Sequence, residues 1–187
     1  MPSSRKPSTH PVRPVARKDA AAVGKLRALC LAFPEANERR SHGEPTWFAG
    51  KGKVFAMLDN HHHGSKHLAV WLPMPPGLQE WLIDTDPERH FRPPYVGPAG
   101  WVGVVLDGRT RWDLVEKLLR EAFVHVAGAR LRDKLLSPVD APRGGGRESA
   151  PRTVRRASPR VSPQGRVKAW TSLFGVPNPK LLYPEPQ

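Results

Sequence analysis

The sequence has little that would place it among disulfide-bonded or membrane proteins. Cys30 is the only cysteine in 187 residues, so no disulfide can form within the chain. A long apolar run is missing, and the basic N-terminus lacks the apolar stretch of a signal peptide. A lone cysteine is typical of proteins kept in a reducing compartment. We therefore expect a cytoplasmic protein that makes no contact with a membrane.

Acidic residues are scarce toward both ends of the chain. The net charge is +13 and the isoelectric point is near 10.7, and most of this excess falls on two proline-rich terminal segments. Segments of this composition bury too little apolar surface to offset the entropy lost on folding. The sequence therefore predicts a disordered basic arm over residues 1–16, one domain over residues 17–136 and a disordered Pro/Arg-rich tail over residues 137–187.

Apolar residues recur at helical spacing in three parts of the predicted domain. We expect the first helix to start at Asp19, as its N-cap, and to end before Pro34, because proline disfavours a helical residue before it. A short second helix is expected near Leu78. A third helix is expected between Thr110 and Gly128, with one apolar face and one charged face.

Short segments of high β-propensity, separated by turn residues, alternate with these helices. Their short connections favour antiparallel pairing. The order of helix, three strands, helix, two strands and helix predicts an α+β fold with two layers, in which helices cover one face of an antiparallel sheet. The five predicted strands are residues 46–49, 54–58, 68–72, 90–92 and 101–106.

Three segments of the chain carry a family resemblance. They read Ser-His-Gly-Glu-Pro-Thr-Trp-Phe at 41–48, Gly-Lys-Gly-Lys-Val-Phe-Ala-Met at 50–57 and Phe-Arg-Pro-Pro-Tyr-Val-Gly-Pro-Ala-Gly-Trp-Val-Gly at 91–103. Together they resemble the MmcQ/YjbR family of small bacterial proteins, over about residues 20–132. The resemblance implies the same order of elements and a fold similar to that of secretion chaperones. It also implies DNA binding, since the family is commonly labelled DNA-binding.

Basic side chains at predicted strand ends and loops are the first candidate site, because phosphates need such donors and nearby rings can stack on bases. Lysine in turns is also routine on soluble surfaces, and the tail adds arginines of its own. The sequence predicts weak, largely non-specific binding of DNA and does not distinguish DNA from RNA or another polyanion. The expected nucleic-acid-binding residues are Arg39, Arg40, Lys51, Lys53, Lys66, Arg92, Arg152, Arg155 and Arg156.

A second candidate surface consists of His42, Trp47, Tyr95 and Trp101, all of which lie in the family-like segments. We expect Trp47 and Trp101 to pack in the core or to line the concave face of the sheet. The fold implied by the resemblance also favours an alternative function. A concave sheet like that of a secretion chaperone would hold a partner peptide, and the protein would then be an interaction module.

Catalytic and cofactor motifs are not visible in the sequence. His42 has no nucleophile or orienting carboxylate at a recognisable spacing. The run His61-His62-His63 with His67 lacks a second ligand set, so we interpret it as adventitious metal affinity. The sequence therefore predicts a non-enzymatic protein without a cofactor or a functional metal.

Overall fold

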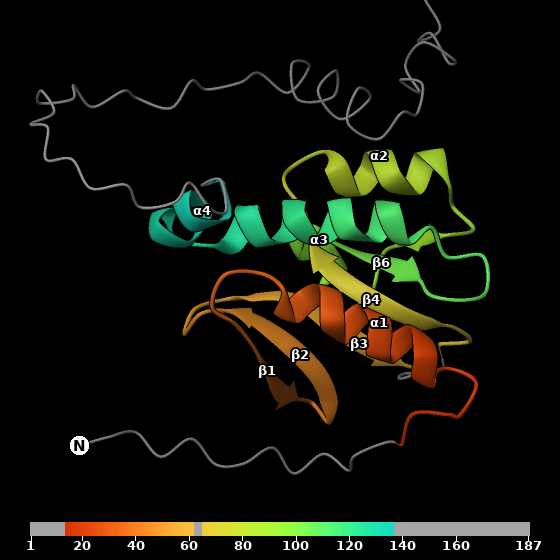
Figure 1. Cartoon of the computed structure of the whole chain (residues 1–187). Helices are drawn as coiled ribbons and strands as arrows, with labels where there is room; N and C mark the ends of the chain where they lie inside the picture. The colour runs from red at the N-terminus through yellow and green to blue at the C-terminus, as the bar shows by residue number, and fades with distance from the viewer. Residues whose placement is uncertain (1–13, 62–64, 137–187) are drawn as a thin grey trace, which may run out of the picture.

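The computed structural model describes residues 14–61 and 65–136. They form a six-stranded antiparallel sheet in the order β1-β2-β3-β4-β6-β5, with helices packed on one face (Figure 1). This arrangement confirms the predicted α+β fold. The strands are β1 (Ala36–Ser41), β2 (Glu44–Ala49), β3 (Val54–Asn60), β4 (Leu68–Pro73), β5 (His90–Phe91) and β6 (Trp101–Val105).

The helical layer is built from segments before, between and after the strands. Helix α3 crosses the central strands β3 and β4, α1 packs beside β1, and α2 contacts β5 and β6 (Figure 1). A short 3-10 helix, η2 (Gly97–Ala99), precedes β6. The helices are α1 (Ala20–Leu31), α2 (Leu78–Thr85), α3 (Trp112–Val126) and α4 (Ala129–Leu136).

An apolar core fills the space between the sheet and the helices. The rings of Phe33, Phe55 and Phe123 meet there, with centroids 4.9–5.5 Å apart. The α3 face predicted from its spacing is buried, including Val115 and Leu119. Burial of this apolar area is the main contribution that holds helices and sheet together.

Strand β1 was not among the predicted strands. Its sequence, Ala-Asn-Glu-Arg-Arg-Ser, has no apolar alternation, because it forms the edge of the sheet and pairs on one side only, with β2. The sheet therefore has four strands before α2, where the sequence predicted three. The backbone pairing of an edge strand needs no apolar side chains, so periodicity does not detect it.

Helix α4 was also missed, since the last predicted helix ends near Gly128. Only Leu131 of α4 is fully buried. Leu135 is partly buried against the same core, and Arg130 and Lys134 donate hydrogen bonds to the Glu35 carboxylate at 2.5–2.6 Å. These contacts lower the pKa of Glu35 to about 2.

The described part of the chain contains no helix that combines the length and the apolar character needed to cross a bilayer.

Candidate nucleic-acid interface

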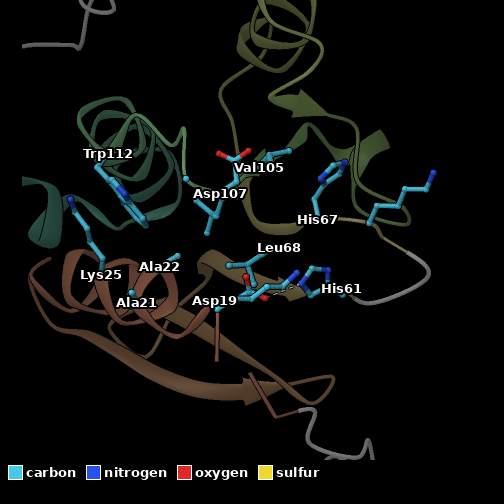
Figure 2. Close-up of a pocket in the computed structure, with 14 residues that line it drawn as sticks. Asp19, Ala21, Ala22, Lys25, His61, His67, Leu68, Val105, Asp107 and Trp112 are labelled. Carbon is cyan, nitrogen blue, oxygen red and sulfur yellow. Dashed lines mark hydrogen bonds and ion pairs between the residues drawn. The ribbon is translucent and has the colours of Figure 1, made fainter. Parts of the chain in front are cut away.

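A cleft of about 590 Å³ opens at one end of the sheet, on the side of the helices. Four segments that are far apart in the sequence meet there: the start of α1, the β3–β4 connection, the end of β6 and the start of α3 (Figure 2). Because β4 runs antiparallel to both β3 and β6, the β3–β4 connection and the end of β6 lie at the same end of the sheet. The cleft is therefore a product of the tertiary fold.

Three lysines give the cleft its basic character. Lys18 lies in the turn before α1, Lys25 lies in the second turn of α1, and Lys66 lies in the β3–β4 connection. None of the three forms an ion pair with a carboxylate of the described residues. The Lys25 ammonium lies 4.9 Å from the centre of the Trp112 ring, a cation–π distance, and Figure 2 shows the two side chains side by side. We name this site the lysine cleft.

The two carboxylates of the lysine cleft are engaged by other partners. Asp19 does not cap α1 with its side chain and instead lies 3.1 Å from His61 Nε2. Arg89 donates hydrogen bonds to both oxygens of Asp107 at 2.7–2.8 Å. The Arg89 guanidinium lowers the pKa of Asp107, which stays ionised. Three lysines against two carboxylates, one of which is held by Arg89, leave an excess of positive charge at the cleft.

The predicted basic residues do not form one patch. Lys66 lines the lysine cleft, whereas Lys51 and Lys53 lie in the β2–β3 turn at the opposite end of the sheet. Lys53 is close enough to His125 to contribute, after burial, to lowering the pKa of that imidazole. Arg92 lies 4.0 Å from the Glu80 carboxylate, at the β5 edge.

Arg39 and Arg40 lie on the exposed edge strand β1, outside the lysine cleft. The Arg39 guanidinium stacks 3.6 Å above the centre of the Phe48 ring. Arg40 donates a hydrogen bond to the backbone carbonyl of Gly43, at 3.3 Å. Because the two arginines are adjacent in a strand, their side chains leave on opposite faces of the sheet and do not act as one pair.

The four residues predicted to form the second candidate surface do not lie together in the structure. His42 and Tyr95 line the same hollow on the face of the sheet that carries no helices. Trp47 lies elsewhere, with no exposed area, in the core beneath the helices. Trp101 is half-buried at the start of β6, where its backbone carbonyl accepts a hydrogen bond from Gln79. Trp47 therefore does not belong to this surface, because side chains alternate between the two faces of the sheet along β2 and the Trp47 side chain points into the core.

Several predicted residues lie outside the described part of the chain: Arg152, Arg155 and Arg156, and also His62 and His63. His61 and His67 both line the lysine cleft. Among residues 14–61 and 65–136, no three histidine, cysteine or acidic side chains are placed to share a metal ion.

Sequence reasoning missed Lys18, Lys25 and Trp112 as site residues. Lys18 lies just before α1, and Lys25 lies inside it, seven residues later. That spacing was the only signal in the sequence. Their meeting with Lys66 and Trp112 depends on how α1 and α3 pack over the sheet.

Comparison with known proteins gives one family and one fold. A family model described as YjbR matches residues 31–125. The crystal structure of Deinococcus radiodurans protein DR2400, described with the domain DUF419, is similar with a TM-score of 0.50 and 22% identity. That similarity covers 67% of this chain and 95% of the other, and at this identity it shows the fold alone. No match was found among curated proteins.

Proposed function

The chain belongs to the YjbR family, and we propose that it binds DNA weakly and largely without sequence specificity, as a non-enzymatic protein. The family is commonly labelled DNA-binding, which supports the proposal. In the fold, the support comes from the lysine cleft, where Lys18, Lys25 and Lys66 converge with no carboxylate partner among the described residues. Of the two acids there, Asp19 is hydrogen-bonded to His61 and Asp107 to Arg89.

Phosphate binding follows from this arrangement by ordinary electrostatics. Each lysine that neutralises a phosphate releases a condensed counterion, so affinity falls as salt rises. Lysine ammonium groups contact phosphates as point charges and read no bases. The binding supplied by the lysine cleft would therefore depend on salt and hardly on sequence. Arg152, Arg155 and Arg156 of the C-terminal segment would add to the same effect.

Fluorescence anisotropy with a labelled duplex over a salt series tests the proposal. The test variant carries Lys18→Gln, Lys25→Gln and Lys66→Gln. A control of equal charge carries Lys51→Gln, Lys53→Gln and Arg132→Gln, around the β2–β3 turn and the neighbouring helix α4. We expect the slope of log K against log salt to become shallower by about 0.9 for each phosphate that the test variant no longer neutralises, and to change little in the control.

Two results would contradict this assignment. A slope that falls more in the control variant than in the test variant would place the interface at the β2–β3 turn. Wild-type protein that binds no duplex at low salt would remove DNA as the ligand, and a salt-tolerant protein partner in a pull-down would then favour the interaction module.

A further inference from the structure

The lysine cleft has the volume of a small-molecule site. Its 590 Å³ lie within the range of about 300–1,000 Å³ that is typical of such pockets. The buried side chains of Leu68, Val105 and Leu106 line its interior, below the exposed lysines. A duplex carries its phosphates on the outside of a broad rod, so it would contact the lysines and leave the apolar interior unfilled. The interior therefore fits a smaller unit, such as one unpaired nucleotide.

Trp112, the first residue of α3, forms part of the wall of the lysine cleft. Its side chain is half-buried and packs against the apolar core, so the ring is held in place. The Lys25 ammonium reaches this ring from α1, on the other side of the cleft (Figure 2). The ring face that Lys25 covers is therefore directed into the cleft. Lys25 is exposed and forms no ion pair with the described residues, so it is free to leave that face.

The segment that carries Lys66 is held on the opposite side of the cleft. The Ser65 hydroxyl group donates a hydrogen bond to the His67 carbonyl at 3.0 Å and accepts one from the His67 backbone N–H at 3.3 Å. This turn fixes the backbone on both sides of Lys66. Figure 2 shows His67 across the cleft from Trp112. An aromatic ring on one side and a lysine on the other match the two ends of a nucleotide, its base and its phosphate.

Only an unpaired base can use the Trp112 ring. In a duplex, neighbouring base pairs cover both faces of each base, whereas the bases of a single strand can leave the stack and lie on an aromatic side chain. Such stacking tolerates every base, because each has a π face. The lysine cleft would thus favour single strands without reading their sequence.

We propose that the lysine cleft binds unpaired nucleotides of single-stranded DNA in preference to duplex DNA. A base stacks on Trp112, in the place that Lys25 occupies in the structure, and the three lysines contact the flanking phosphates. Trp112 supplies the preference for the single strand, and the lysines supply the dependence on salt. This inference rests on the proposed DNA binding and names the form of DNA that the same site takes.

Fluorescence anisotropy of the full chain with three labelled probes tests the preference. The probes are a short single strand of mixed sequence, the duplex that it forms with its complement, and an abasic strand of equal length and charge. Charge alone favours the duplex, which carries twice the phosphates in the same length. We expect the single strand to bind at least about fivefold more tightly than either of the other probes, because stacking adds to the phosphate contacts. A duplex that binds as tightly as the single strand, or an abasic strand that does so, would overturn the proposal.

Variants of Trp112 assign the preference to its ring. Trp112→Leu removes the ring and keeps an apolar side chain against the core, so the preference for the single strand should disappear while duplex affinity stays the same. Trp112→Phe keeps a ring that stacks and should retain most of the preference. A preference that persists in Trp112→Leu would contradict the role of Trp112. If Trp112→Leu does not fold, the comparison of the single strand with the abasic strand on the wild type decides.

Phe48→Leu is the matched control. Phe48 is also a half-buried ring under a cation, since the Arg39 guanidinium lies 3.6 Å from its centre, but it belongs to β2 and does not line the lysine cleft. This variant should bind all three probes as the wild type does. A preference lost in Phe48→Leu and kept in Trp112→Leu would place the single-strand site at the β1–β2 edge and refute the assignment.

The two proposals can fail separately. Duplex binding whose salt dependence changes in the triple lysine variant supports the proposed function, and equal binding of strand and duplex would then refute only the inference about single strands. Strand binding without duplex binding would support this inference and contradict the duplex binding tested above. Binding of none of the probes would refute both.

Discussion

The indole N–H of Trp47 donates a hydrogen bond of 3.1 Å to the Glu38 carboxylate, across the β1–β2 pair. The same carboxylate accepts hydrogen bonds from Arg27 of α1 at 2.7 and 3.1 Å. Glu38 therefore connects a buried ring of β2, the edge strand β1 and the first helix. This contact explains how a polar edge strand is fixed against the core.

Trp47→Ala should destabilise the protein by about 3–5 kcal/mol, because Trp47 is fully buried and the change leaves a large cavity. Trp47→Phe should cost less, since it keeps most of the apolar contact and removes only the hydrogen bond to Glu38. Urea denaturation followed by circular dichroism measures both. Trp101→Ala is the comparison: Trp101 is half-buried, so a destabilisation as large as that of Trp47→Ala would contradict the packing.

Gly24→Ala should stabilise the protein by about 0.5–1 kcal/mol. Gly24 lies inside α1, and a Cβ atom added there would meet nothing within 4 Å. Alanine removes the backbone entropy that glycine loses when the helix forms. Thermal melts would show a higher midpoint, and a lower one would mean that α1 contacts something at this position.

Gly103→Ala should destabilise the protein by about 1–3 kcal/mol, because the added methyl group overpacks the site. The added methyl group would overlap the Phe91 ring, since the Cβ position is 2.3 Å from its nearest atom. A double-mutant cycle with Phe91→Ala measures the coupling. The cost of Gly103→Ala should shrink when Phe91 is already alanine. Additive effects would show that the ring does not cover Gly103 in solution.

The stability of the fold should fall as the solution becomes mildly acidic, because of His90. Its side chain is 4% exposed, and burial lowers its pKa from the ordinary value of 6.5. The unfolded chain then binds a proton that the folded chain does not. The free energy of unfolding is therefore highest above the unfolded-state pKa and decreases as the pH falls through it, by at most about 1.4 kcal/mol per pH unit.

His90→Gln removes this titration, so the free energy of unfolding should depend less on pH between about pH 7.5 and pH 5.5. Chemical denaturation at several pH values measures the slope. His125 has a pKa lowered in the same direction, first by burial and then by Lys53, and His125→Gln gives the comparison. An unchanged slope in His90→Gln would show that the unfolded and folded chains bind the same number of protons at this residue.

Much of the fold could be predicted from the order of residues. The spacing of Val115, Leu119 and Phe123 predicted α3 and its buried face, and high β-propensity between turn residues predicted the central strands. The segments around Trp47, Phe55 and Tyr95 indicated the YjbR family, which the family model confirms. These features are local or depend on strong apolar periodicity, so they can be recognised without a structure.

The sequence analysis missed elements that bury little apolar surface. Strand β1 is held by backbone pairing and needs no apolar side chains. Helix α4 has only eight residues and packs on the core through Leu131 and Leu135, which is too short a pattern to stand out in the sequence. The sequence likewise presented Lys51, Lys53 and Lys66 as one group, although the β2–β3 turn and the β3–β4 connection lie at opposite ends of β3.

The sequence by itself determined the fold class, the family and the basic character of the chain, because these depend on composition and on apolar periodicity. Only the tertiary structure decided which charges meet. It gathered Lys18, Lys25 and Lys66 into one cleft and placed Trp47 of β2 in the core, away from His42 and Tyr95. The physical reason is that strand register and helix packing set distances between residues far apart in the chain, and electrostatic interactions depend on those distances.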